Sequence, residues 1–218
     1  MKKTILLFSI LWLPFLASAQ WSVQITAGGG SAAESAVAVK QVIYSRAETK
    51  QETTSDFGYS FQGGIDVQYF INSKIGFGTG LGYRYSKSRV LTVLSPSGEK
   101  NWHAESIKIP FVFLWSPGES HRSVFNVGMA THFNLMRYDI ASSVETNNQN
   151  PVFTSAQLGY AYKLGERFQV GILLDRDISW YSRTTNYLSE TTLFYDRYFS
   201  SLQLTLSYRL FGSSKSKK

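Results

Sequence analysis

Two short segments carry residue types that nucleophilic or acid–base catalysis would need. In the first, His132 and Asn134 lie two positions apart. A His followed two residues later by a Ser on one strand would suit a lipid hydrolase, but Asn134 cannot serve as the nucleophile. We therefore predict no catalytic residue here and expect His132 to be a hydrogen-bonded histidine in a protein interior.

In the second segment, Asp175 and Asp177 would share one face of a strand. Paired carboxylates can perform acid–base chemistry or bind a cation. Arg84 and Lys108 are predicted to face the same interior, so ion pairing is the favoured role of the two acids.

The composition argues against several other kinds of site. The chain has no Cys, and His103 and His121 are too scattered to suggest a metal site. No phosphate-binding loop, zinc-ligand spacing or dinucleotide fingerprint is present. The formal net charge of +7 falls to +2 when the five lysines near the two ends of the chain are set aside. We therefore predict no metal, no cofactor and no nucleic-acid partner.

The elements that would position these residues are strands. The stretch 57–85 alternates bulky residues with small or polar ones on both sides of a turn at 71–74. Alternation with a period of two predicts strands with one apolar and one polar face. In a soluble sandwich the apolar face would pack on another sheet. In a transmembrane barrel it would face lipid, and the polar face would line a narrow interior.

The same alternation recurs along the chain and predicts eight strands. They are expected near residues 21–29, 57–69, 75–93, 102–115, 122–138, 152–163, 167–180 and 199–211. Three connections are short turns. The other four are mostly longer, including 181–198 and 30–56, where 37–44 could add a strand extension or hairpin. This pattern predicts an all-β fold, an eight-stranded antiparallel up-and-down transmembrane β-barrel, with both termini on the periplasmic side.

The two ends of the chain suggest how it is divided. Residues 1–19 have a basic start, an apolar core and the small residues Ala17 and Ala19, which are typical of a secretory signal cleaved after Ala19. The barrel domain would then span 20–212, and 213–218 would form a basic tail. We predict a protein of the bacterial outer membrane.

Several motifs give the chain a resemblance to a known group. They are the leader ending Ala17-Ser18-Ala19-Gln20, the glycine-rich strand 76–83, the segment Ile107-Lys108-Ile109-Pro110 and the ending 206–211. On these features the chain resembles small eight-stranded outer-membrane barrels of the OmpA/OmpX type, and most of all the PorT-like outer-membrane β-barrel family. The resemblance implies a barrel fold and adds an accessory role in protein secretion to the functions considered.

Aromatic residues gather where two membrane interfaces would lie. Those near the short turns are Trp21, Tyr69, Trp115, Tyr160, Tyr162, Phe168 and Tyr208. Those near the longer loops are Phe57, Tyr59, Tyr83, Tyr85, Phe153 and Phe199. Trp and Tyr favour the headgroup level of a membrane. Two separate bands therefore favour a membrane barrel over a soluble core filled by the same rings.

The inward face is predicted to carry a balanced set of charges that, with His132, forms a polar network in the lumen. The acids are Asp66, Asp175 and Asp177, and the bases are Arg84, Lys108 and Arg209. Counted from the turns, Asp66 would lie opposite Gly78 and Gly80, and Lys108 would lie opposite Gly128 and Ala130. Eight strands enclose little more than their own side chains. We therefore predict a plugged, non-conducting barrel, with a small water-lined pore as the alternative.

Four cations are predicted on the outward face near the loop ends: Lys87, Arg89, Arg137 and Arg176. They could bind lipid phosphates of the outer leaflet, with Arg in bidentate fashion. The alternative is that they simply extend to solvent.

The main functional prediction is a non-catalytic integral outer-membrane barrel with a filled lumen, whose extracellular loops interact with a partner or serve envelope structure. The expected partners are outer-membrane lipid or lipopolysaccharide and, through the loops, an extracellular or envelope protein. The alternatives are a lipid-modifying enzyme of the same membrane, an accessory barrel of a secretion system, and a secreted soluble barrel that binds an apolar ligand.

Overall fold

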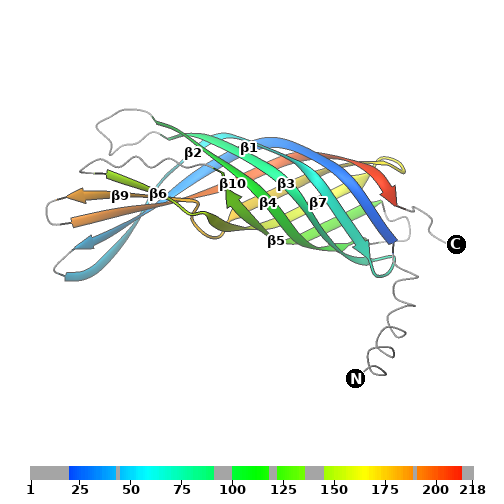
Figure 1. Cartoon of the computed structure of the whole chain (residues 1–218), viewed down its shortest axis with the longest axis horizontal. Helices are drawn as coiled ribbons and strands as arrows, with labels where there is room; N and C mark the ends of the chain where they lie inside the picture. Colours follow the sequence, from blue (N-terminus) through cyan, green and yellow to red (C-terminus); the bar gives the residue numbers. More distant parts are fainter. Residues whose placement is uncertain are drawn as a thin grey trace, which may run out of the picture.

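The computed structural model describes residues 20–42, 45–90, 100–117, 122–135, 145–188 and 191–212. Within these ranges the chain consists of strands joined by turns (Figure 1). The strands are β1 (Gln20–Val42), β2 (Ser45–Phe70), β3 (Ile75–Val90), β4 (Lys100–Trp115), β5 (Ser123–Asn134), β6 (Glu145–Gln149), β7 (Val152–Lys163), β8 (Phe168–Asp177), β9 (Ser182–Leu188) and β10 (Thr191–Gly212). In this part of the chain, no helix has the length and apolarity that crossing a membrane requires. The predicted signal and basic tail lie outside the described residues.

Eight strands close into an antiparallel barrel. Neighbours pair in the order β1-β2-β3-β4-β5-β7-β8-β10, and β10 pairs back with β1. Closure satisfies the backbone groups that an open sheet would leave at its edges. The predicted eight-stranded antiparallel barrel is confirmed. The first residues of β1 and the last of β10 lie at the same end of the cylinder, which is the end of the short turns (Figure 1).

Two segments predicted as longer connections are mostly strand, and the strand extension considered for 37–44 is confirmed over 37–42. Most of 30–56 belongs to β1 and β2, which pair from Gln20↔Phe70 to Val42↔Ser45. Most of 181–198 belongs to β9 and β10, which pair with each other. The reason is that the far part of β1 has partners on both sides, β2 on one and β10 on the other, up to Val42↔Thr191. Its backbone groups are therefore satisfied as a strand.

These extra residues form a sheet that continues beyond the barrel. β2 pairs with β3 only from Gly58 onward, and β10 pairs with β8 only from Ser200 onward. Past these points the order is β2-β1-β10-β9-β6. We call the residues involved, 36–42, 45–56, 145–149, 182–188 and 191–197, the protruding sheet. It extends along the barrel axis away from the end where the described termini lie (Figure 1).

The two faces of the barrel wall differ as the alternation predicted. Outward apolar side chains are exposed, such as Phe111 at 67% and Leu204 at 66%, whereas inward polar ones such as His132 and Gln203 are buried. An apolar exterior around a polar interior is the arrangement of a barrel whose solvent is lipid.

The positions of the glycines and the strand register determine how much space the inward side chains have. Asp66 lies opposite Gly80, as predicted. A Cβ atom at position 80 would lie 2.6 Å from Oδ1 of Asp66, so the glycine leaves space for this carboxylate. The predicted neighbours of Lys108 were wrong, because Lys108 lies opposite Gly82 on β3 and His132 on β5.

The error in the Lys108 register comes from the β4–β5 connection. This connection brings Trp115 opposite Phe125. When the turn is centred on 116–121, each β4 residue is paired with a β5 residue that comes earlier in the chain than its actual partner. Part of the connection, 118–121, lies outside the described residues.

Pro110 interrupts one place in the wall. β3 and β4 pair from Ile75↔Trp115 to Val90↔Lys100, but Gly80 and Leu81 have no register partner in β4. They face Pro110 and Ile109. Because proline has no backbone N–H, one ladder hydrogen bond between these strands cannot form.

Candidate functional site: the polar interior of the barrel

The centre of the lumen holds a buried ionic cluster that we define as Arg84, Lys108, His132, Asp175 and Asp177. Arg84 donates to Asp177 with both terminal nitrogens, Nη1 to Oδ1 at 2.8 Å and Nη2 to Oδ2 at 3.1 Å. Its Nη1 also lies 3.5 Å from Oδ1 of Asp175. This bidentate geometry on a 1% exposed guanidinium fixes both partners in place.

Lys108 completes the charge balance of the central ionic cluster. Its Nζ lies 3.4 Å from Oδ2 of Asp175 and also donates to Oε1 of Gln62. Gln157 donates to the same Asp175 oxygen at 2.8 Å. Two bases thus meet two acids from three strands, as expected for charges that are removed from water.

His132 is held by two hydroxyl groups. Its Nδ1 lies 3.0 Å from Oγ of Ser106, and its Nε2 lies 2.9 Å from Oγ of Ser155. A catalytic triad would need a carboxylate on one of these nitrogens, with the serine on the other. All three residues are at most 1% exposed, so a substrate in the membrane or in water has no contact with them.

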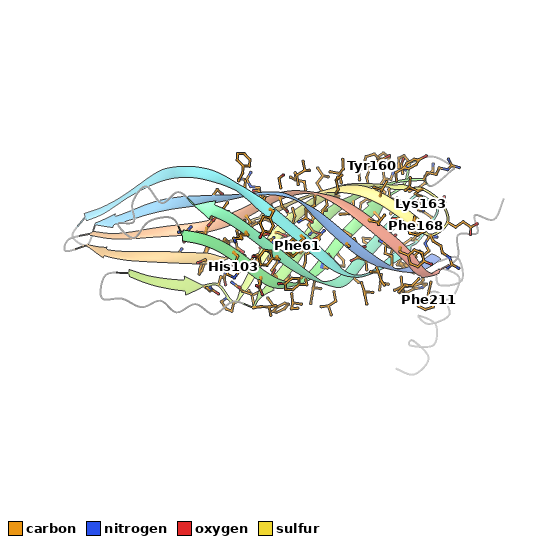
Figure 2. All side chains as sticks on the ribbon, turned by 90° about the horizontal axis from the view of Figure 1, so that it is seen from above. Phe61, His103, Tyr160, Lys163, Phe168 and Phe211 are labelled. Atoms are coloured by element: carbon orange, nitrogen blue, oxygen red, sulfur yellow. The ribbon has the colours of Figure 1, made fainter. Side chains whose placement is uncertain are left out.

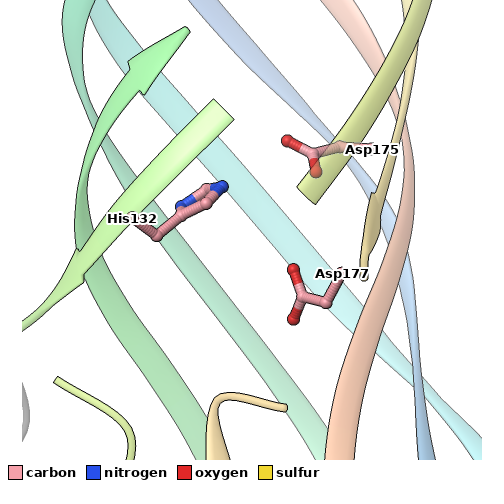
Figure 3. A group of neighbouring side chains, drawn as sticks. All are labelled: His132, Asp175 and Asp177. Atoms are coloured by element: carbon pink, nitrogen blue, oxygen red, sulfur yellow. The ribbon is translucent and has the colours of Figure 1, made fainter. Parts of the chain in front are cut away.

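His132, Asp175 and Asp177 also resemble a metal site, because they point toward one another across the lumen (Figure 3). One ligand atom from each lies within 4.8 Å of the others. Arg84 and Lys108, however, already bind the two carboxylates. The guanidinium supplies the positive charge that a metal ion would otherwise bring.

A second set of buried residues lies nearer the protruding sheet. Phe153, Tyr181 and Phe199, which we call the aromatic layer, are at most 2% exposed. Phe153 stacks on His132 with ring centroids 4.6 Å apart, and Tyr181 stacks on Phe199 at 4.8 Å. The prediction that Phe153 and Phe199 belong to an outer band was wrong, because both share strand parity with inward residues such as Ser155 and Ser201.

The aromatic layer supports another ion pair. Arg197 donates to Oε1 of Glu34 at 2.9 Å, the Tyr181 hydroxyl donates to the same oxygen at 2.9 Å, and Ser88 bonds to Oε2. Sequence reasoning missed this group because Glu34, Tyr181 and Arg197 fell in segments expected to be loops. The signal was nonetheless present: small and polar residues at even positions continue from Ser22 to Glu34.

Two predicted members of the network lie apart from the central ionic cluster. Asp66 accepts a hydrogen bond from Thr26 at 2.6 Å and makes no ion pair with any described residue. Arg209 lies across from Gln24 near the short-turn end of the barrel. The balanced set of three acids and three bases is thus not one connected group.

A cavity of about 120 Å³ occupies the half of the lumen nearer the short turns. Its polar lining includes Gln24, Asp66, Asn126 and Gln169, and its apolar lining includes Val112, Leu114 and Val124. Lys108 also lines it, so the cavity ends at the central ionic cluster.

The predicted rim cations are only partly described. Lys87 is half-buried on β3, and Arg176 is exposed on β8. The side chain of Arg89 and all of Arg137 lie outside the described part of the structure. Beyond the rim, Arg183 of β9 donates to Asp196 at 2.5 and 2.8 Å, and this hydrogen bonding raises the pKa of Arg183.

Outward aromatic side chains form contacts at two levels. Near the short turns, Trp21 packs on Tyr69, and Phe168 packs on Tyr208, with centroids 4.8 and 5.0 Å apart. Farther along the axis, Phe61 stacks on Tyr85 at 4.9 Å. Figure 2 shows Tyr160, Phe168 and Phe211 toward the end where the described termini lie, with Phe61 and His103 farther from it.

Comparison with known proteins agrees with this geometry. The profile of the family described as "Outer membrane protein beta-barrel domain" matches residues 18–183. The chain belongs to this family. It is therefore a protein of the bacterial outer membrane, and its exposed apolar wall faces lipid.

Several solved structures are similar to the chain. OprG from Pseudomonas aeruginosa is 14% identical over 86% of this chain and 95% of its own, with a TM-score of 0.48. AlkL, solved in DMPC bilayers, is 16% identical over 90% and 93%, with a TM-score of 0.46. Neisserial surface protein A is 13% identical over 85% and 96%, with a TM-score of 0.43. Among curated proteins, no significant match was found.

Proposed function

We propose that this protein is a non-catalytic outer-membrane barrel that presents the protruding sheet to an extracellular or envelope protein partner. One observation carries the proposal: β1, β2, β9, β10 and β6 remain paired as a sheet after the barrel wall has ended. In outer-membrane barrels the short turns face the periplasm. The sheet would therefore project outward from the cell.

The filled interior supports this proposal. The central ionic cluster and the aromatic layer connect facing sides of the barrel with buried, hydrogen-bonded contacts. Such contacts make a stiff base for strands that rise from the wall. The sheet also offers polar backbone edges, which are a common means of binding an extended peptide.

The geometry around His132 argues against the enzyme alternative. Both of its ring nitrogens bind buried serine hydroxyls, and no carboxylate orients the ring. Release of fatty acid from phospholipid by the refolded protein, lost on Ser155→Ala, would contradict a non-catalytic role.

A shortened variant tests the role of the protruding sheet. Removal of residues 37–52, with Asn-Gly joining Ala36 to Thr53, keeps the pair Ala36↔Thr53 and supplies a tight hairpin turn. We expect this variant to reach the outer membrane and to unfold at the wild-type temperature. Cross-linking on intact cells should join a discrete partner to the wild type and not to the variant. Equal cross-linking of both proteins would refute the proposal.

A further inference from the structure

In the described part of the chain, two unpartnered hydrogen-bond acceptors and one unpartnered donor line the cavity in the short-turn half of the lumen. Among the described residues, Oε1 of Gln24 and Oδ1 of Asn126 are buried without a hydrogen-bond partner, and both residues line the cavity. Gln24 is only 5% exposed. On the donor side, Nε2 of Gln169 is the unpartnered cavity atom in this part of the chain. Buried carbonyl oxygens ordinarily find a donor, so their partner should occupy the cavity.

Asp66 adds a negative charge to the same cavity. Its carboxylate accepts a hydrogen bond from Thr26. The nearby bases bind other acids, because Arg84 pairs with Asp177 and Lys108 with Asp175. Of the residues that line the cavity, only Asp66 and Lys108 are charged, and Lys108 is shared with Asp175; Arg209 lies across from Gln24 but does not line the cavity. Asp66 is part-buried and has no ion pair among the described residues, which favours a bound cation beside it.

We propose that this cavity binds a small primary ammonium ion. Its N–H groups would donate to Asp66, Gln24 and Asn126. Its short alkyl group would lie against the apolar part of the lining, formed by Val112, Leu114 and Val124. A volume of about 120 Å³ accommodates an ion of a few heavy atoms together with water. Lys108 lines the cavity as well, and its charge limits the affinity.

The ion would come from the periplasmic side. Leu114 and Val124 line the cavity one residue from the strand ends at Trp115 and Ser123. The central ionic cluster and the aromatic layer separate the cavity from the other end of the barrel. The cavity would thus be a binding site with one access, and binding would not lead to transport.

Methylammonium chloride tests the site, with tetramethylammonium chloride at equal concentration as the control. Both salts give the same ionic strength, but tetramethylammonium has no N–H donor. We expect the melting temperature of the refolded protein to rise with methylammonium and to saturate, with no matching rise in tetramethylammonium. The Asp66→Asn variant should lose the rise, whereas Glu105→Gln, which removes a partly exposed carboxylate of β4, should keep it. Equal responses to the two salts, or a full response in Asp66→Asn, would overturn the proposal.

A second measurement covers the case in which Asp66→Asn is itself less stable. The signal of ¹³C-methylammonium should broaden on adding folded wild-type protein at a temperature where both proteins are folded. Excess unlabelled methylammonium should reverse the broadening. Asp66→Asn should broaden the signal several-fold less. If the wild type causes no broadening that competition can reverse, the cavity holds water alone and the proposal fails.

Discussion

Arg84 and Asp177 face each other across the lumen from β3 and β8, joined by two hydrogen bonds of 2.8 and 3.1 Å. The pair connects two strands that are not neighbours in the barrel. It therefore connects opposite sides of the barrel, whereas the backbone hydrogen bonds connect only neighbouring strands.

Loss of one partner of this pair should destabilise the barrel strongly. Arg84→Met would leave Asp177 buried and unpaired, which typically costs about 3–5 kcal/mol. The double variant Arg84→Met with Asp177→Asn should lose less, since no charge is left alone. Urea unfolding of protein refolded into lipid vesicles measures both. Arg176→Met, which changes an exposed cation of β8, is the matched control and should stay close to wild type. Additive losses in the double variant would show that the two residues are not coupled.

The barrel should not conduct ions. The central ionic cluster and the aromatic layer fill successive levels of a lumen that eight strands make narrow. Planar-bilayer recordings of the refolded protein should give no regular current steps. Steady, reproducible single-channel steps would restore the pore alternative. The triple variant Phe153→Ala, Tyr181→Ala and Phe199→Ala removes the aromatic layer and shows whether that level contributes to the seal.

The rim cations should contribute to lipid binding. We propose that Lys87, Arg89, Arg137 and Arg176 bind phosphates of outer-leaflet lipid, because Arg and Lys form charge-assisted hydrogen bonds with such groups. Neutralising all four should reduce the lipopolysaccharide that co-purifies with the protein. Lys74→Gln in the periplasmic turn is a control at the opposite end of the barrel. An unchanged amount of lipopolysaccharide in the fourfold variant would refute the idea.

The leader should be removed after Ala19. Small residues at 17 and 19 are what signal peptidase requires. Mass spectrometry of the protein from outer membranes should give a chain that begins at Gln20, the first residue of β1. A retained leader, or a start well inside β1, would contradict the prediction.

The barrel could be predicted from the sequence because one pattern holds along its wall: successive side chains face lipid and the lumen in turn. Strands such as β8 follow this pattern over their whole length, with Leu174 outward and Asp175 inward. This pattern is weaker above the membrane, because both faces of a strand meet water there and polar residues can occupy either face. That is why most of the protruding sheet, rich in Thr, Asn and Ser, was expected to be loop, apart from the possible strand extension at 37–44.

The sequence predicted which charged residues face the interior, but not which of them form ion pairs. The alternation gave the inward direction of Arg84, Lys108 and Asp175. Which base meets which acid depends on the stagger between distant strands, and no local pattern in the sequence encodes that stagger. Glu34 and Arg197 show this best, since 163 residues separate two groups that form one ion pair.

Pro110 locally weakens the contact between β3 and β4 in the cylinder wall. At this level the carbonyl of Gly80 faces a proline ring instead of an amide, and both β3 neighbours on the inner face, Gly78 and Gly82, lack side chains that could brace the gap. Stress from lateral membrane pressure would therefore concentrate between β3 and β4. The rest of the wall would keep its shape while the contact between β3 and β4 near Pro110 deforms.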